Sequence, residues 1–406
     1  MIRLGRKHAM MRSPANAGRR RAPRQPRRWR IAVMVPLALL APLVLLLSTC
    51  GPPGDVGVQL AAFAPRRPLP APQVPAHFTD DAFIAADGAR LPLRKWLPRG
   101  PVRAVILALH GFGDYSHGFA IPAKRWANYG IATYAYDQRG FGAAPDRGLW
   151  AGEGQLVVDA IVADRILRRM YPDTPLYIAG ESMGGAVAIL AMSGAEKGVI
   201  PGPGGVVPRA DADGVILGAP AVWGRATMDF WPRAALFIAA RLVPDMVLTG
   251  RGLHVLASDN IPMLRALAKD PLVEKGARVD TIYGLVDLMD DALSAAPRLA
   301  APMLLMYGAN DQIVPKIAIR DFTAHLTQAA RARDTLAYYP HGYHLLFRDL
   351  DGAIVARDVA SWIFDRGSAL PSYADRAEDA RVWPPPGAAP ALAHRAMPLA
   401  SAAGGR

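Results

Sequence analysis

The chain has 406 residues, of which 51% are hydrophobic, and it carries a formal net charge of +13. Residues 1–30 hold ten Arg, one Lys and no acidic residue, which leaves 36 of the 47 basic side chains and all 34 acidic ones for the rest of the chain. That body is nearly neutral, so it lacks the basic surface of a nucleic-acid-binding protein. The single cysteine, Cys50, excludes an internal disulfide framework and a multi-cysteine zinc site.

The N-terminus contains the parts of an export signal. A basic stretch precedes an uncharged apolar run over 31–48, and small residues follow near Cys50. As a helix this run would span about 27 Å, just short of the ~30 Å hydrocarbon core, and Pro36 and Pro42 interrupt it. The alternative is an uncleaved anchor with its basic end in the cytoplasm. Both interpretations place residues after 50 on the exported side of a membrane.

The sequence LSTC (47–50) resembles the lipobox of bacterial lipoproteins, in which the cysteine is acylated and becomes the mature N-terminus. Thr49 departs from that pattern, because a smaller residue usually precedes the cysteine. The resemblance implies lipidation of Cys50 and a location in the bacterial cell envelope. An incidental cysteine after an anchor is the alternative.

Two proline-rich segments flank the centre of the chain. Residues 51–75 contain seven prolines and predict an extended linker. Residues 371–406 are rich in Ala and Pro and contain no motif, so we expect a disordered tail. The segment between them, 76–370, is predicted to be one domain.

Strands and helices alternate through the central segment, which indicates an α/β fold with a mostly parallel sheet and helices on both faces. The predicted strands are short apolar runs at 82–86, 90–96, 102–109, 131–136, 176–179, 214–217, 303–307 and 336–339. The predicted helices lie at 119–128, 154–170, 183–195, 316–327 and 352–364. Residues 222–297 interrupt this alternation with a helical, aromatic-rich stretch, which we interpret as an inserted cap. Each aromatic taken singly could equally belong to an ordinary core.

The sequence GESMG (180–184) follows a predicted strand and precedes a predicted helix, which is the context of a nucleophile elbow. Such a turn strains the backbone of its central residue and requires small neighbours, because a Cβ there would clash. It exposes the Ser182 hydroxyl at a helix N-terminus, where the Met183 N–H favours negative charge. We predict that Ser182 is a nucleophile.

An activated serine needs a base, and the base needs an acid that orients it. Asp311 follows a late predicted strand, on a loop that can reach the edge of the sheet where Ser182 lies. A turn or N-cap role is the alternative for an Asp at such a position. Asp287, Asp290 and Asp291 are weaker candidates for the acid because they fall in helical pattern inside the cap.

Two histidines follow the next strand. His344 precedes an apolar pair on a loop and is the preferred base, although spacing alone leaves His341 open. Further upstream, HGFGD (110–114) follows another strand, and its Phe112 N–H can join that of Met183 in an oxyanion hole. A plain turn at the end of a strand is the alternative. We expect His110 to stabilise this loop rather than act as a base.

These segments together resemble the α/β-hydrolase superfamily, and within it the monoacylglycerol lipase and lysophospholipase group, also called serine-aminopeptidase-like hydrolases. The matching segments are HGFGD (110–114), YDQRGFG (136–142), GESMGG (180–185), GANDQIVP (308–315) and GYHLLFRD (342–349). The resemblance implies an α/β-hydrolase fold in which residues 222–297 form a cap over an acyl pocket. The implied site residues are Ser182 as nucleophile, Asp311 as acid, His344 rather than His341 as base, and Phe112 and Met183 as oxyanion donors. The cap sequence itself matches no motif, so no substrate carries over.

The predicted reaction is acyl transfer to Ser182 followed by hydrolysis of the acyl-enzyme, with no metal or organic cofactor. An apolar cap and a membrane tether favour a lipid ester, such as a monoacylglycerol or a lysophospholipid, and no nucleic-acid partner is expected. A peptidase acting on N-terminal residues is the enzymatic alternative, and cap carboxylates that bound an α-amino group would support it. A non-catalytic envelope lipoprotein on the same scaffold is the third interpretation. Serine at the elbow, in place of Asp, disfavours epoxide hydrolase and dehalogenase chemistry.

Overall fold

A computed structural model of the chain describes residues 74–194, 209–250 and 255–376. The predicted export signal with Cys50, nearly all of the 51–75 linker and the tail from 377 onward lie outside the described residues. Within the described ranges, no helix combines the length and the apolar character that crossing a bilayer requires.

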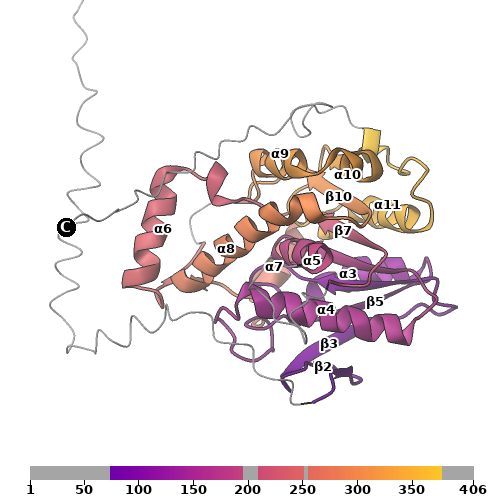
Figure 1. Ribbon diagram of the computed structural model, residues 1–406, viewed down its shortest axis with the longest axis horizontal. Helices are drawn as coiled ribbons and strands as arrows, with labels where there is room; N and C mark the ends of the chain where they lie inside the picture. The colour runs from indigo at the N-terminus through magenta and orange to yellow at the C-terminus, as the bar shows by residue number, and fades with distance from the viewer. Residues whose placement is uncertain (1–73, 195–208, 251–254, 377–406) are drawn as a thin grey trace, which may run out of the picture. The chain divides into compact units, whose positions relative to one another are not determined.

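A mixed nine-stranded sheet forms the centre of the described residues (Figure 1). Its strands are β1 (His77–Phe78), β2 (Ala82–Ile84), β3 (Arg90–Trp96), β4 (Ala104–Leu109), β5 (Ile131–Tyr136), β6 (Leu176–Glu181), β7 (Gly214–Gly218), β10 (Met303–Gly308) and β11 (Thr335–Tyr339). Their order across the sheet is β1-β2-β3-β5-β4-β6-β7-β10-β11. The pairs from β1 to β5 are antiparallel, and those from β5 to β11 are parallel. Every residue of β4, β5, β6 and β10 is buried, as the continuous apolar runs predict.

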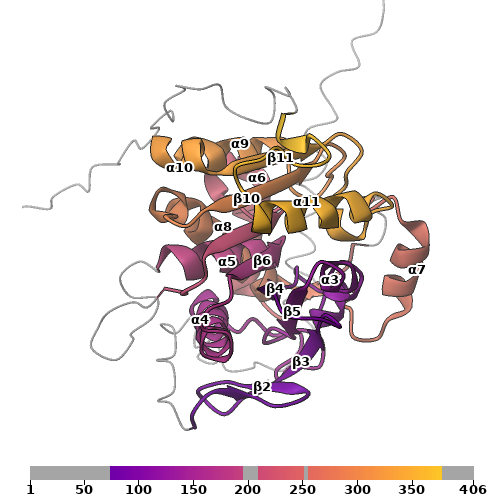
Figure 2. The same ribbon diagram turned by 90° about the vertical axis from the view of Figure 1, so that its right-hand side faces the viewer.

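Helices cover both faces of this sheet (Figure 2). The helices on one face are α4 (Glu153–Met170), α5 (Met183–Ser193), α8 (Val279–Ala295), α9 (Lys316–His325) and α10 (Gln328–Arg333). Those on the other are α3 (Ala120–Ala127) and α11 (Gly352–Phe364). Each layer buries its own apolar cluster, and this is the arrangement that the strand–helix alternation predicts. The strand expected at 131–136 and the helix expected at 352–364 have the expected bounds.

The described structure continues beyond the boundary expected at 370. A short 3₁₀ helix, η5, spans Ala374–Arg376, and Leu370 and Ala374 are buried in the same cluster as α11. The hydroxyl of Ser372 donates a hydrogen bond to Asp358 on α11. The predicted boundary therefore falls too early, because apolar contacts with α11 hold this segment.

The segment expected to be a cap lies between β7 and β10. It holds the short 3₁₀ helices η2 (Arg225–Thr227) and η3 (Ala296–Arg298), the helices α6 (Phe230–Leu242), α7 (Ile261–Lys269) and α8, and the small antiparallel pair β8 (Val247–Leu248) and β9 (Ala277–Arg278). Helix α8 packs against α4 and α5 and contributes Leu288 and Ala292 to the core, so it also covers the sheet. Helix α6 packs against α8 and presents most of its side chains to solvent.

Candidate active site

Ser182 forms the turn between β6 and α5. Its φ of 53° and ψ of −116° lie in a region that L-residues avoid. The Ser182 N–H donates to the carbonyl of Gly218 at 3.0 Å, and the Ser182 carbonyl accepts from the N–H of Ala221 at 2.9 Å. The end of the neighbouring strand β7 thus holds the strained turn in place, and Ser182 keeps a partly exposed surface.

The glycines around Ser182 are required by close backbone contacts. A Cβ at Gly180 would lie 2.3 Å from the Gly184 carbonyl oxygen, and a Cβ at Gly184 would lie 2.0 Å from that of Leu109. Both distances are too short for a non-bonded contact between a carbon and an oxygen atom. The turn is therefore sterically what the GESMG sequence predicts.

Asp311 and His344 meet at the carboxyl edge of the sheet. Strands β10 and β11 are parallel neighbours, so the loops that follow them lie together, with the Asn310 N–H bonded to the Gly342 carbonyl at 2.9 Å. Nδ1 of His344 lies 2.9 Å from Oδ2 of Asp311, and the imidazole side chain is 4% exposed. His341, by contrast, is exposed. The structure therefore pairs Asp311 with His344.

The other oxygen of Asp311 is held by the backbone. Its Oδ1 accepts from the N–H groups of Ile313, at 2.8 Å, and Val314, at 3.0 Å. Among the described residues, no hydrogen bond joins His344 to the Ser182 hydroxyl. Such catalytic contacts often tighten only when substrate binds.

The glycine-rich loop after β4 runs alongside Ser182. A Cβ placed on Gly111 would be 3.3 Å from Ser182 Cβ and 4.0 Å from its Oγ. In the part of the chain that the structure describes, the N–H groups of Phe112 and Met183 have no hydrogen-bond acceptor. Both are therefore free to bind an oxyanion beside Ser182.

His110 is hydrogen-bonded to this loop and to the loop after β5. It is 1% exposed, its Nδ1 lies 2.9 Å from the Gly111 carbonyl, and the Gln138 N–H donates to its Nε2 at 2.9 Å. Burial lowers the pKa of His110. A neutral imidazole with both nitrogens engaged stabilises the loop, which is the role expected from the sequence.

One arginine of the cap forms ion pairs with two of the carboxylates considered above. Arg225 contacts both Asp290 and Asp287, the latter at 2.8 Å. Burial raises the pKa of Asp287, and Arg225 opposes that rise. All three carboxylates lie on α8, whereas His344 is paired with Asp311.

A buried cluster of ion pairs lies close to Ser182, and the sequence patterns did not predict it. Arg348 donates hydrogen bonds to Asp114 and to Glu181, each at 2.6 Å. Their opposite charges could have suggested the cluster, because each of the three residues stands inside one of the quoted motifs, close to a predicted site residue.

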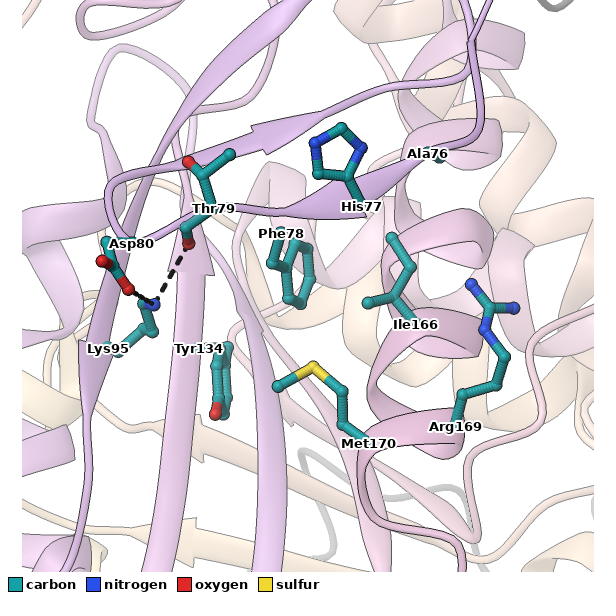
Figure 3. Close-up of a pocket in the computed structure, with 10 residues that line it drawn as sticks. All are labelled: Ala76, His77, Phe78, Thr79, Asp80, Lys95, Tyr134, Ile166, Arg169 and Met170. Atoms are coloured by element: carbon teal, nitrogen blue, oxygen red, sulfur yellow. Dashed lines mark hydrogen bonds and ion pairs between the residues drawn. The ribbon is translucent and has the colours of Figure 1, made fainter.

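A broad open hollow of about 760 Å³ lies beside β1, the outermost strand on one side of the sheet (Figure 3). Phe78, Tyr134 and Ile166 line it, with Lys95 donating to the Thr79 carbonyl at 3.1 Å. None of the predicted catalytic residues contributes to this hollow, so it is separate from the candidate active site.

The mostly parallel sheet, the helices on both faces and the serine elbow define the protein as an α/β-hydrolase. Solved structures agree on the fold. A monoacylglycerol lipase from Paleococcus ferrophilus superposes with a TM-score of 0.52 at 23% identity, over 67% of this chain and 98% of that one. A soluble variant of monoglyceride lipase from Saccharomyces cerevisiae, solved with a substrate analogue, gives 0.56 at 19% identity over 73% and 98%.

The family model for serine aminopeptidase, S33 (Hydrolase_4) matches residues 100–351, and the chain belongs to this family. Mouse monoglyceride lipase is 28% identical over 296 residues, which cover 70% of this chain and 90% of the relative. Monoacylglycerol lipase from Mycolicibacterium smegmatis is 24% identical over 288 residues, or 70% and 96%. The chain is thus a distant homologue of monoglyceride lipases.

Proposed function

We propose that the protein is a serine hydrolase that cleaves lipid carboxylic esters, with monoacylglycerol or lysophospholipid as the substrate class. The observation that carries the proposal is the pairing of His344 with Asp311 on loops at the same edge of the sheet as the strained Ser182. The names of the homologous monoglyceride lipases support the choice of a lipid ester.

In the proposed reaction, His344 Nε2 takes the proton of Ser182 Oγ as that oxygen attacks the ester carbonyl. The N–H groups of Phe112 and Met183 bind the oxyanion of the tetrahedral intermediate. The C–O bond to the alcohol then breaks, and His344 returns the proton to the leaving alcohol. Water, activated in the same way, releases the fatty acid and regenerates Ser182. Asp311 keeps the His344 proton on Nδ1 throughout.

Exposed apolar side chains on the cap support a lipid substrate. Trp231 is 73% exposed and Leu242 is 61% exposed, both on α6. Their neighbours on α6 and β8 with similar exposure are Phe230, Phe237, Ile238, Val247 and Leu248. Large exposed apolar side chains in such number often mark an interaction surface. In Figure 1, α6 lies at the left, apart from the sheet, and its exposed apolar side chains would suit contact with a membrane surface.

Peptidase activity is the second candidate, because the family description is that of a serine aminopeptidase. It would require a carboxylate free to bind the substrate α-amino group. Asp287 and Asp290 do not fit that requirement, since both are paired with Arg225. These two ion pairs therefore support the ester over the peptide.

The test combines covalent labelling with a substrate panel. A fluorophosphonate should label the wild-type chain and not Ser182→Ala, which should also lower ester turnover by about 10⁶-fold. Monoacylglycerols of graded chain length and lysophospholipid should be hydrolysed faster than aminoacyl amides. Esterase activity that survives Ser182→Ala would refute the assignment, faster amide hydrolysis would favour the peptidase, and absence of labelling would favour a non-catalytic protein.

We also propose that the protein is exported and tethered to the bacterial cell envelope through residues 1–50. The support is the order of basic stretch, apolar run and Cys50 in the sequence. Labelled palmitate should enter the wild-type chain and not Cys50→Ala. Equal labelling of both, or of neither, would contradict lipidation at Cys50 and leave the uncleaved anchor as the tether.

A further inference from the structure

One buried guanidinium connects three of the loops that carry predicted site residues. Arg348 belongs to the loop of His344, Asp114 ends the glycine-rich loop of Phe112, and Glu181 directly precedes Ser182. Nη1 of Arg348 donates to Asp114 Oδ2 and Nη2 donates to Glu181 Oε2, each at 2.6 Å. These bonds span 234 and 167 positions of the chain, so only the tertiary fold brings the loops together.

The cluster is almost sealed from water. The side chains of Arg348, Glu181 and Asp114 are 3%, 4% and 11% exposed. A Cβ on Gly118 would lie 2.7 Å from Asp114 Oδ2 and 3.2 Å from Arg348 Nη1, so the chain leaves just enough room for the ion pair there. In such surroundings the hydrogen bonds of the guanidinium are short and directional.

The backbone of Arg348 is held by hydrogen bonds, as its guanidinium is. Its backbone N–H donates to the Leu345 carbonyl at 2.8 Å, and its own carbonyl accepts from the side chain of Asn260 at 2.9 Å. The backbone of the His344 loop is therefore fixed relative to the guanidinium. The guanidinium in turn bonds Glu181, which precedes Ser182, and Asp114, which ends the glycine-rich loop. The three loops are therefore held at fixed positions relative to one another.

The charges make this connection difficult to break. Burial by itself lowers the pKa of Arg348, but Asp114 and Glu181 raise it above its ordinary value. Burial raises the pKa of Glu181, and Arg348 opposes that rise. Separation of the loops would leave buried charges without partners, which is strongly unfavourable.

We propose that Arg348 is a positioning residue that sets the placement of the nucleophile, the oxyanion donors and the base relative to one another. The proposal rests on the proposed function of Ser182 as the nucleophile. Catalytic groups must be held to within about 0.5 Å, and a displacement of about 1 Å can cost about 10²-fold in rate. Three loops from different parts of the sheet have no covalent connection near the site that would ensure this precision.

The test compares Arg348→Met and Arg348→Lys with Arg139→Met in the full-length chain, purified in detergent. Arg139 is a matched control, because it also bridges two carboxylates, Asp159 at 2.6 Å and Asp87 at 2.7 Å, with a side chain that is 12% exposed. These partners lie outside the three loops. Fluorophosphonate titration counts reactive sites, and kcat and KM for nitrophenyl acetate are expressed per titrated site. Unfolded protein then does not enter the comparison.

Arg348→Met should lower kcat about 100-fold with KM within about threefold, because the groups are present but displaced. Arg348→Lys should recover part of that loss, since an ammonium reaches one carboxylate as a point charge. Arg139→Met should lower the unfolding temperature and leave kcat per site within about threefold. If Arg348→Met retains kcat within threefold, or loses no more than Arg139→Met, the positioning role is overturned.

If Arg348→Met does not fold, Asp114→Asn is used in its place. It keeps the shape and removes one charged arm, and kcat should fall about tenfold, roughly the 1.4 kcal/mol of a weakened charge-assisted hydrogen bond. An unchanged kcat in that variant also overturns the proposal. A wild-type chain that neither reacts with the fluorophosphonate nor hydrolyses the ester would refute the proposed function itself. An active wild type with unaffected variants refutes only the positioning role.

Discussion

Replacement of Asp311 by asparagine tests the proposed acid with almost no change in shape. The amide oxygen of Asp311→Asn must stay with the backbone N–H groups of Ile313 and Val314, because an NH₂ there would face two donors. The NH₂ then faces Nδ1 of His344, which lies 2.9 Å from the present Oδ2. The imidazole must accept at Nδ1 and carry its proton on Nε2. In that tautomer it cannot take the proton of Ser182.

The expected loss follows from this tautomer. A carboxylate-to-amide change at the same position of a serine triad lowers kcat by about 10⁴, which corresponds to about 5 kcal/mol of barrier. Stability should change much less, because both backbone hydrogen bonds remain and one charge-assisted hydrogen bond contributes about 1.5–3 kcal/mol. The prediction is therefore a large fall in kcat with a small fall in unfolding temperature.

The assay measures kcat on a short nitrophenyl ester per correctly folded molecule, with the folded fraction taken from circular dichroism. Asp334→Asn is the control, because Asp334 also accepts a backbone hydrogen bond, from Met303 at 3.1 Å, but at the opposite end of β10. Its kcat should stay within about threefold. If Asp311→Asn keeps more than a tenth of the wild-type kcat, Asp311 is not the orienting acid and the tautomer argument fails.

Three further predictions concern packing, the cap and pH. Gly184→Ala should destabilise the fold by about 3 kcal/mol, because its Cβ would lie 2.0 Å from the Leu109 carbonyl oxygen. The control is Gly100→Ala, whose Cβ would have no atom within 4 Å and which should change stability by less than about 0.5 kcal/mol. Equal midpoints of chemical unfolding would contradict this. Trp231→Ser should lower turnover of vesicle-borne monoacylglycerol about tenfold, because the variant loses part of the apolar area that the exposed indole would bury in the vesicle surface. Turnover of a soluble ester should be unaffected. Equal losses on both substrates would show that α6 acts on the site and not on the membrane. Burial raises the pKa of Asp164 from 3.8 to about 7, so the folded chain keeps a proton that the unfolded chain has lost, and stability falls as pH rises between those values. Asp164→Asn should therefore raise the unfolding temperature more at pH 8 than at pH 5, and a constant difference would refute the burial argument.

The features that could be predicted from the sequence depend on neighbours in the chain. The strand–turn–helix around Ser182 is encoded within one contiguous stretch, and the clashes at Gly180 and Gly184 occur inside it or with the adjacent strand. Alternation of apolar strands with helices was likewise sufficient for the α/β fold, since buried parallel strands have few other arrangements. The choice between His341 and His344, in contrast, needed either the family resemblance or the contact with Asp311.

The cap shows where sequence patterns stop being informative. Aromatic residues in helical pattern predict a buried face as readily as an exposed one. The structure places Trp223 against the core and leaves Phe230 and Trp231 exposed, although all three stand close together in the chain. Helix α8 lies within the expected cap and nevertheless covers the sheet. Exposure depends on which other elements pack against a helix, and a local pattern carries no information on that.

The residue patterns were enough to predict the fold class, Ser182 as nucleophile, Asp311 as acid, a base among two histidines, and the tethering of residues 1–50. The contacts between distant residues are visible only in the folded chain: Asp311 with His344, Arg225 with the cap carboxylates, and Arg348 with both Asp114 and Glu181. The difference lies in how far apart along the chain the interacting residues stand. A turn or a strand is specified by residues a few positions apart, whereas a buried ion pair depends on where distant segments lie after the whole sheet has formed.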